Sequence, residues 1–296
     1  MKNKINSRSV RMTAVNSRET SAIVSLGSNN TTLSNAVKKD YSGMNFSNVT
    51  DFSKYSFKGA NLSRAVFDNL DFEQVKNFNP DFSGAKLDRT YFYNTKMPNA
   101  NFQGATITTS IFDDADLRGA IFSSSTITHT SFSSANLTEA NFSSTIFNGE
   151  IDLSEANLLN ANFIDAKFND IVDFSYADFT KANFTNSFII GTFSGAIFDG
   201  TIFNSATLQG SFQVGYKNKE KSKIFNNVNF RNAKLAKIDF SYYPNKEIII
   251  LRNVDFTGAI FSSKYDIFLD EDTKELAVKF ENTLCRDGKN TNVRCY

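Results

Sequence analysis

The sequence predicts one elongated repeat domain in which the chain turns a corner every five residues. A large apolar residue recurs at every fifth position, and most of the 31 phenylalanines occupy this grid. A small residue usually stands two positions earlier, as Ala115 does before Leu117 and Ala120 before Phe122. Apolar residues recur every 3.6 positions in a helix and every 2 in a strand, so a period of five fits neither. Each unit therefore points one large and one small side chain inward.

The grid extends from Phe52 to Phe261 with a few changes of phase, and its longest regular part runs from Phe82 to Phe147. Repeats of this kind build solenoids that are stabilised by contacts between neighbouring coils. We therefore expect the large residues to form the core. In the regular part the predicted core residues are Phe82, Leu87, Phe92, Phe102, Phe112, Leu117, Phe122, Phe132, Leu137 and Phe142.

The unit around each large residue reads Ala, then Asp or Asn, then Leu or Phe, then Ser or Thr, as in residues 60–63, 135–138 and 182–185. In these units the chain resembles the pentapeptide-repeat family over residues 50–262. The resemblance implies an all-β fold, a right-handed quadrilateral β-helix with four units per coil. With about 20 residues per coil, residues 50–262 would form about ten coils, stacked at roughly the 4.8 Å spacing between strands.

Large residues alternate strictly between Phe and an aliphatic or Met residue from Phe82 to Phe142. In a four-unit coil this alternation puts Phe on two opposite sides. Two facing ladders of stacked rings are therefore expected, which add stability beyond area burial. The Asp or Asn before many large residues, such as Asp116 and Asn136, is expected to bond a corner or a neighbouring coil. The expected ladders are Phe82, Phe102, Phe122, Phe142 and, facing them, Phe92, Phe112, Phe132.

Composition divides the chain into a disordered basic leader rich in Ser and Asn (1–41), the repeat domain (42–262) and a helical cap with a Cys-containing tail (263–296). The acid-poor leader resembles those of bacterial type III effectors and, more weakly, an organelle transit peptide. A plain disordered tail is the alternative. Neither a Sec-type signal peptide nor a membrane span is visible. The expected location is the bacterial cytoplasm, or outside it by a non-Sec route.

The formal net charge of +1 hides an asymmetry along the chain. Residues 50–212 contain ten Lys or Arg and eighteen Asp or Glu, whereas residues 213–264 contain ten and four. The repeat domain is therefore expected to be acidic over most of its length and basic toward its C-terminal end, which bears on the charge of its partners.

Interruptions of the grid are the predicted functional positions, because loops escape the constraint of the repeat. Residues 213–223 and 241–251 are predicted to contain exposed loops, with Ile248–Leu251 as a strand that packs on the coils. Residues 76–80 are interpreted as a distorted corner without an insertion, because the phase is kept. The predicted partner-binding residues are Tyr216, Lys217, Lys219, Lys221, Lys223, Tyr242 and Tyr243.

The C-terminal part predicts a short capping helix, since Leu276, Phe280 and Leu284 recur every four residues. A homodimer contact, which some family members make with this segment, is the alternative role. The tail from Thr283 resembles the T-x-C-P-D-G…C tail of many family members, with Arg in place of the proline. It suggests a disulfide between Cys285 and Cys295, with two free thiols as the alternative.

No pattern in the sequence indicates catalysis or a cofactor. The single histidine, His129, is expected to point outward, and no His or Cys cluster has metal-ligand spacing. We therefore expect a non-catalytic protein that binds a protein partner of unknown identity, with no direct contact to nucleic acid. The more specific form of this expectation is a bacterial secreted effector. A DNA-mimicking modulator of DNA gyrase or topoisomerase, as in the quinolone-resistance members of the family, is the alternative.

Overall fold

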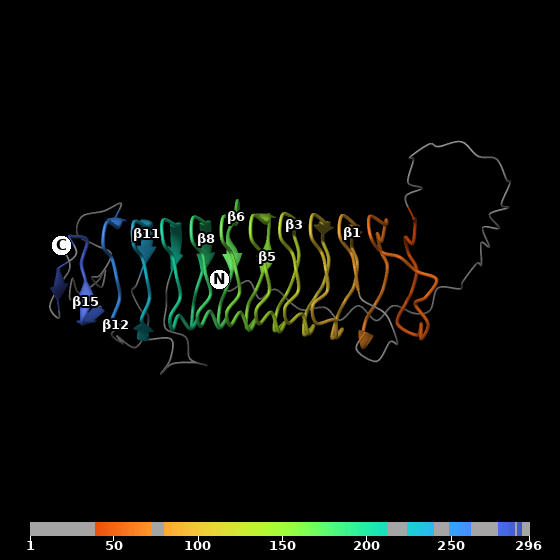
Figure 1. Ribbon diagram of the computed structural model, residues 1–296, viewed down its shortest axis with the longest axis horizontal. Helices are drawn as coiled ribbons and strands as arrows, with labels where there is room; N and C mark the ends of the chain where they lie inside the picture. The colour runs from red at the N-terminus through yellow and green to blue at the C-terminus, as the bar shows by residue number, and fades with distance from the viewer. Residues whose placement is uncertain are drawn as a thin grey trace, which may run out of the picture. The chain divides into compact units, whose positions relative to one another are not determined.

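The computed structural model of the protein describes residues 39–72, 80–211, 224–239, 249–261, 278–287 and 289–291. These residues form a stack of coils along which the sheets run (Figure 1). Every regular element in the described ranges is a β-strand. The predicted all-β helix is therefore confirmed.

Neighbouring coils are joined by parallel strands. The main sheet has the order β1 (Lys86–Asp88), β2 (Thr106–Thr108), β3 (Thr126–Thr128), β4 (Ile146–Asn148), β6 (Lys167–Phe168), β8 (Phe188–Thr192), β9 (Thr207–Ser211), β11 (Lys234–Asp239) and β13 (Ile260–Phe261). Beside it, β5 (Ile151–Asp152) pairs with β7 (Val172–Asp173), which also pairs with β8. A second sheet contains β10 (Ile224–Asn226), β12 (Ile249–Arg252) and β14 (Val278–Glu281). Only the last pair, β15 (Thr283–Leu284) with β16 (Asn290–Thr291), is antiparallel among the described strands.

Four ladders of paired residues run along the stack, and each defines one side of the coil. Side A is the main sheet. The ladders of the other sides contain Val66, Tyr91, Ile111 and Ser131 (side B), Asp71, Lys96, Asp116 and Asn136 (side C), and Asp81, Asn101, Ile121 and Asn141 (side D).

The coil length follows from the pairing register. On side A, Lys86 pairs with Thr106 and Thr106 with Thr126, so partners are 20 residues apart. This spacing confirms the predicted coil of four five-residue units. Between β4 and β6 the spacing is 21, because Ile146 pairs with Lys167. The one-residue gain in the grid after residue 147 is thus absorbed within one coil.

The interpretation of residues 76–80 as a distorted corner is wrong. Val66 pairs with Tyr91 and Asp71 with Lys96, which are 25 residues apart, whereas Asp81 pairs with Asn101 at 20. This coil therefore contains one extra five-residue unit between sides C and D. An insertion of five residues leaves the phase of a five-residue grid unchanged, so phase could not reveal it. Residues 73–79 themselves lie outside the described residues.

The core consists of two facing ladders of Phe rings, as predicted. The rings of Phe82 and Phe102 stack at 4.8 Å with an angle of 5°, and those of Phe102 and Phe122 at 4.7 Å and 2°. Phe92 and Phe112 stack in the facing ladder at 4.8 Å. The ladders meet edge to face, since the rings of Phe102 and Phe112 are 5.5 Å apart at 87°. All of the predicted core residues listed above are fully buried.

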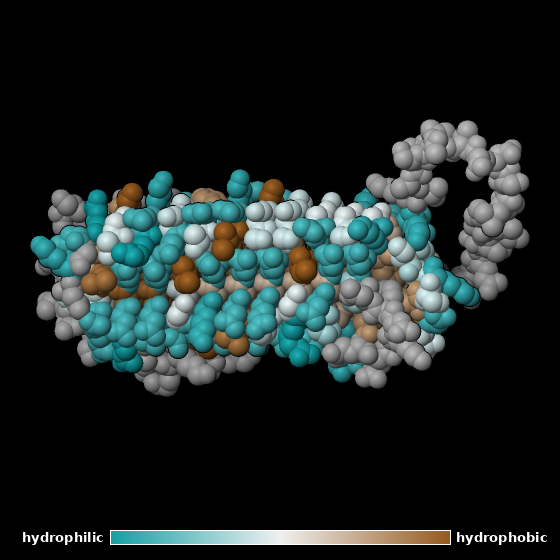
Figure 2. Space-filling model, in the orientation of Figure 1, coloured by the Kyte–Doolittle hydropathy of each residue, from teal (hydrophilic) through white to brown (hydrophobic). Residues whose placement is uncertain are grey.

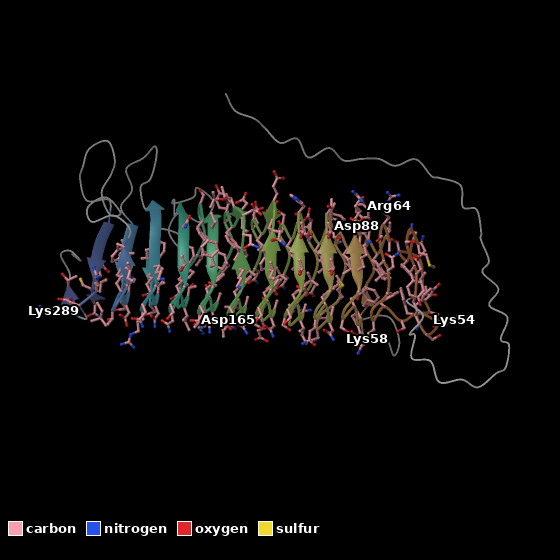
Figure 3. The ribbon with its side chains drawn as sticks, turned by 90° about the horizontal axis from the view of Figure 1, so that it is seen from above. Lys54, Lys58, Arg64, Asp88, Asp165 and Lys289 are labelled. Atoms are coloured by element: carbon pink, nitrogen blue, oxygen red, sulfur yellow. The ribbon has the colours of Figure 1, made fainter. Side chains whose placement is uncertain are left out.

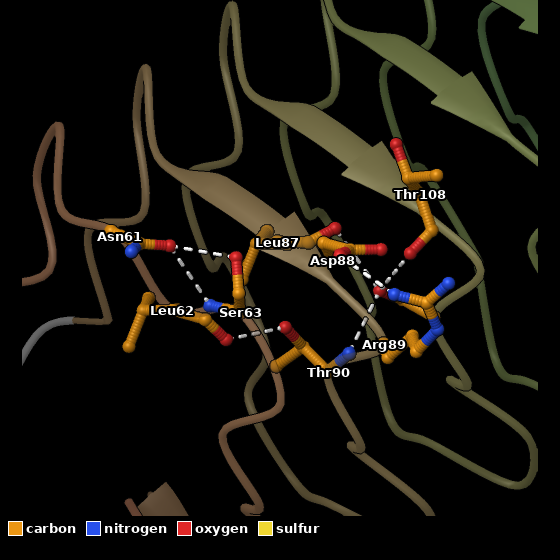
Figure 4. Close-up of polar contacts among 9 residues, drawn as sticks. Asn61, Leu62, Ser63, Leu87, Asp88, Arg89, Thr90 and Thr108 are labelled. Carbon is orange, nitrogen blue, oxygen red and sulfur yellow. Dashed lines mark hydrogen bonds and ion pairs between the residues drawn. The ribbon is translucent and has the colours of Figure 1, made fainter. Parts of the chain in front are cut away.

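Asp and Asn residues close the corners, as expected. The Oδ1 atom of Asn61 accepts hydrogen bonds from the Ser63 N–H at 3.2 Å and from its Oγ at 2.7 Å (Figure 4). Asp116 and Asn136 accept the same backbone bond from the residue two positions on. Such side chains mimic a backbone turn and so favour it locally. The next residue, for example Arg64 at φ 62°, adopts the left-handed conformation.

Buried hydroxyls replace alanine at the corner between sides A and B. The Oγ1 atom of Thr90 donates to the Leu62 carbonyl at 2.7 Å (Figure 4). The Thr90 N–H donates to Ser110 Oγ at 3.1 Å in the next coil. The Thr130 hydroxyl donates to the Thr128 carbonyl at 2.9 Å. The hydroxyls of Thr90, Ser110 and Thr130 at this corner are thus satisfied, which a buried polar group requires.

The prediction of a capping helix is wrong for the described residues 278–284, because these residues contain the strands β14 and β15. Phe280 pairs with Leu251 of β12, and Leu284 pairs with Asp255. β12 is a strand as predicted, but it belongs to side C instead of packing on the coils from outside. Pairing with the preceding coil therefore outweighs the helical spacing, because tertiary contacts override weak local propensity.

The last described unit continues the five-residue grid. Thr283 takes the small inward position, is fully buried, and its Oγ1 donates to the Leu251 carbonyl at 2.9 Å. Cys285 takes the large position, five residues after Phe280. The grid thus extends beyond Phe261, the last large residue that the spacing in the sequence assigned to it.

Candidate interaction surfaces

Metal-binding groups are absent from the described ranges, where no three His, Cys, Asp or Glu side chains could together hold an ion. His129 is exposed at the corner between sides A and B, and its Nδ1 accepts a hydrogen bond from the Glu150 N–H at 3.2 Å. No helix in the same ranges is long and apolar enough to cross a membrane. The candidate sites are the outer sides of the coils and the interruptions of the stack.

The predicted partner-binding residues all lie outside the described residues, but their flanking strands do not. Ser211, at the end of β9, pairs with Asp239 at the end of β11. On the far side of the two interruptions, Ile224 of β10 pairs with Ile250 of β12. The segments 212–223 and 240–248 therefore leave neighbouring strands of one sheet and return to neighbouring strands of another.

A third interruption connects the same two sheets. β13 pairs with β11, and β14 pairs with β12, so residues 262–277 connect the next pair of strands. Sequence reasoning placed these residues in a terminal cap and did not group them with the two earlier segments. The missing signal was the strand register, which depends on coil neighbours that are distant in sequence.

Side B carries negatively charged side chains and no cationic side chain of its own. Its outward residues in six consecutive coils include no Lys or Arg between Val66 and Tyr176. On side C, by contrast, Lys96 forms an ion pair with Asp71 at 3.2 Å. No ion pair involves the side B aspartates within the described part of the chain. The carboxylates of side B are Asp68, Asp113, Asp114, Asp152, Glu155 and Asp173.

Two of these carboxyls are partly buried. Burial raises the pKa of Asp68, although the Tyr93 N–H donates to its Oδ1 at 3.1 Å and opposes the shift. Burial also raises the pKa of Asp113, despite the hydrogen bond from the Ser131 hydroxyl, and the carboxylate of Asp152 adds to the rise. The folded coils therefore disfavour the charged forms of Asp68 and Asp113.

Replacing Asp113 by asparagine (Asp113→Asn) should raise the free energy of unfolding at pH 7 by up to about 1 kcal/mol after solvent screening. Because its folded-state pKa is raised, the stability that Asp113 contributes is fully present below the ordinary value of about 3.9. This stability is lost as the pH rises through the pKa that Asp113 has in the folded protein. The gain in the variant should therefore shrink toward zero near pH 3. Urea denaturation at both pH values measures it.

Asp165→Asn is the matched control, since it removes one charge from a carboxyl that Figure 3 shows pointing away from the coils. It should leave the unfolding midpoint almost unchanged at both pH values. A gain for Asp113→Asn that is as large at pH 3 as at pH 7 would contradict the assigned role of burial.

Cys285 forms a disulfide and is buried among the core residues. Its N–H donates to the Lys289 carbonyl at 2.8 Å, next to the β15–β16 pair. Cys295, the only other cysteine of the chain, lies outside the described residues. Its pairing with Cys285 stays a prediction.

The filled coils, the parallel ladders and the polar outer sides define a β-solenoid repeat protein. The family model of pentapeptide repeats matches residues 81–114, 110–149 and 150–189, with 8 copies of the repeat. Residues 81–189 therefore consist of pentapeptide repeats, as the motif resemblance implied. No protein of curated function matches it in sequence.

Solved structures of three repeat proteins are similar to the chain. QnrB1, a plasmid-mediated fluoroquinolone resistance protein studied in trypsin-treated form, is 18% identical with a TM-score of 0.47, over 76% of this chain and 91% of that one. HetL, involved in heterocyst differentiation regulation in the cyanobacterium Nostoc, is 19% identical with a TM-score of 0.32, over 86% and 95%. A pentapeptide repeat protein of the Arabidopsis thaliana thylakoid lumen is 26% identical with a TM-score of 0.19, over 45% and 72%.

Proposed function

We propose that the protein is a non-catalytic scaffold that binds another protein through the interruptions and outer sides of its coil stack. The observation that carries the proposal is the paired anchoring of segments 212–223 and 240–248. Segments held one coil apart on a rigid scaffold can contact a single partner together. Their composition supports this role, since tyrosine is enriched in interfaces. Lys217, Lys219, Lys221 and Lys223 favour an acidic partner.

A loop graft tests the first segment. Residues 193–196 connect Thr192 to Ile197 one coil earlier, and Thr192 pairs with Ser211. Phe198 stacks on Phe225 at 4.9 Å, so the ends of this short connection match those of segment 212–223. Replacing 212–223 by a copy of 193–196 should remove the segment and keep the coil register.

Affinity capture then compares the wild-type chain, the graft, and a variant in which the four lysines of the segment are replaced by serine. We expect a partner that is captured by the wild type and lost from the graft. Loss from the lysine variant as well would identify charge as the cause. If the graft captures every protein that the wild type captures, segment 212–223 is not the binding site.

The finer version of the proposal is a bacterial effector that leaves the cell by a non-Sec route. Its support is the leader, where residues 1–40 contain seven basic and two acidic residues, together with the cysteine-bearing tail. A reporter fused to residues 1–40 should be secreted or targeted by a competent host. A reporter that stays in the bacterial cytoplasm would overturn this version.

Light scattering of the full chain tests the homodimer through residues 263–296.

Side B favours a second candidate, a DNA-mimicking modulator of DNA gyrase or topoisomerase. Its six carboxylates lie along six coils, which at about 4.8 Å per coil gives about one charge per 5 Å. Duplex DNA carries about one charge per 1.7 Å, so side B is a sparse imitation and the first proposal is preferred. A gyrase supercoiling assay decides between them: neither inhibition nor protection from a fluoroquinolone would remove the second candidate.

A further inference from the structure

Side B carries a column of apolar side chains in addition to its carboxylates. Val66, Tyr91 and Ile111 occupy the same outward position in three consecutive coils, because Val66 pairs with Tyr91 and Tyr91 with Ile111. Tyr93, in the neighbouring outward column, is 47% exposed. Its backbone N–H contacts Asp68 in the preceding coil. The half-buried column and the exposed Tyr93 together form a strip of neighbouring apolar and aromatic positions along this side.

In the coils around this strip, outward apolar residues of other sides stand alone. On side D, Ile121 pairs with Asn101 and Asn141. On side A, Ile146 pairs with two polar residues, Thr126 and Lys167. Figure 2 shows a mostly hydrophilic face on which most apolar side chains are scattered among hydrophilic ones. Scattered surface apolar residues are ordinary, whereas a contiguous strip indicates an interaction site.

Carboxylates lie on side B beside the strip and in the coils that follow it, at a cost to the free protein. Asp152 and Asp173 are register partners between β5 and β7, so two like charges lie opposite each other, which is destabilising. Burial raises the pKa of Asp113, which lies between the strip and this pair. A cationic group placed beside these carboxylates would relieve both effects. Side B itself contains no Lys or Arg that could place a cationic group beside these carboxylates.

We propose that side B, between Val66 and Tyr176, binds a protein segment that carries lysine or arginine side chains and apolar side chains on the same face. The apolar side chains would pack on the strip, and the cationic groups would reach Asp113, Asp152 and Asp173. Charge complementarity selects this class of partner, since the phosphates of a nucleic acid or of an anionic membrane would be repelled. This inference rests on the proposed binding function but assigns a different surface from segments 212–223 and 240–248.

Three labelled peptides of twelve residues test the inference by fluorescence anisotropy with the full chain at about 0.15 M salt. One repeats Lys-Lys-Leu-Leu, one Lys-Lys-Ser-Ser and one Glu-Glu-Leu-Leu, so that each face of an extended peptide carries both kinds of residue. The Lys–Leu peptide should bind at least about tenfold more tightly than the Lys–Ser peptide, because leucine buries apolar area on the strip. The Glu–Leu peptide should not bind. Equal affinity of the first two peptides, or binding of the third, would overturn the inference.

Two side B variants locate the site. Replacing Tyr91 and Tyr93 by serine, or Asp113, Asp152 and Asp173 by asparagine, should each weaken the Lys–Leu peptide by at least about tenfold. The second variant keeps the apolar column, so it still tests the site if the tyrosine variant does not fold. The matched control replaces Ile121 by serine and Asp165 and Asp178 by asparagine on other sides, and should bind as the wild type does. Equal weakening in the control would show that binding is not specific to side B.

The graft of residues 193–196 into positions 212–223 separates this inference from the proposed function. If side B is the peptide site, the graft binds the Lys–Leu peptide with wild-type affinity. Loss of peptide binding in the graft would overturn the side B assignment and leave the proposed binding function standing. Side B variants that lose the peptide but still capture the partner lost from the graft would support two separate surfaces.

Discussion

Replacing Phe122 by alanine (Phe122→Ala) should lower the free energy of unfolding by about 3–5 kcal/mol. The ring is fully buried and stacks between Phe102 at 4.7 Å and Phe142 at 4.8 Å. It also meets Phe112 and Phe132 edge to face. The hydrogen-bonded coils on both sides hold these neighbours in place, so the cavity cannot collapse. Equilibrium denaturation followed by circular dichroism measures the loss.

Ile121→Ala is the matched control, because this neighbouring side chain points outward and is 37% exposed. The Ile121→Ala variant should lose no more than about 0.5–1 kcal/mol of its free energy of unfolding, as for most surface substitutions. A loss for Phe122→Ala below about 1.5 kcal/mol would mean that the coils relax into the cavity far more than the stacked ladders suggest.

The second large effect is expected for Gly210→Ala in β9, at about 2–4 kcal/mol of destabilisation. Gly210 has a φ of 148° and pairs with Gly191 of β8. A Cβ atom at this position would overlap the carbonyl oxygen of Gly191, which is backbone and cannot rotate away. The two strands would have to separate locally, so the thermal midpoint should fall clearly.

Gly84→Ala separates backbone conformation from steric overlap. Gly84 has a φ of 63°, and nothing lies within 4 Å of an added Cβ atom. Only the left-handed conformation then opposes the substitution, which costs about 1 kcal/mol. Equal losses at the two glycines would show that the approach of β8 and β9 does not restrict position 210.

Much of the fold follows from local sequence. The inward residues of the five-residue unit are set by its own corner, which Asn61 or Asp116 closes through a bond to the backbone two positions on. The buried residues could therefore be predicted one by one from spacing. The facing ladders followed as well, because the alternation of Phe with aliphatic residues is regular over the coils from Phe82 to Phe142.

Features that depend on neighbouring coils could not be derived in this way. The extra unit between sides C and D preserves the phase and appears only in the pairing of Asp71 with Lys96. Phe280 and Leu284 have helical spacing, but their pairing with Leu251 and Asp255 places them in strands. The candidate surfaces are of the same kind. Val66, Tyr91 and Ile111 form a strip only because the register stacks them.

The sequence by itself thus determined the five-residue unit, its corners and its core. The tertiary structure alone decided which units lie side by side, and with them the acidic and apolar side B and the common origin of the interruptions. The physical reason is the range of the interactions. A corner is closed within five residues, whereas neighbouring side chains on one side of the stack come from positions 19 or more residues apart, such as Asp178 and Ile197.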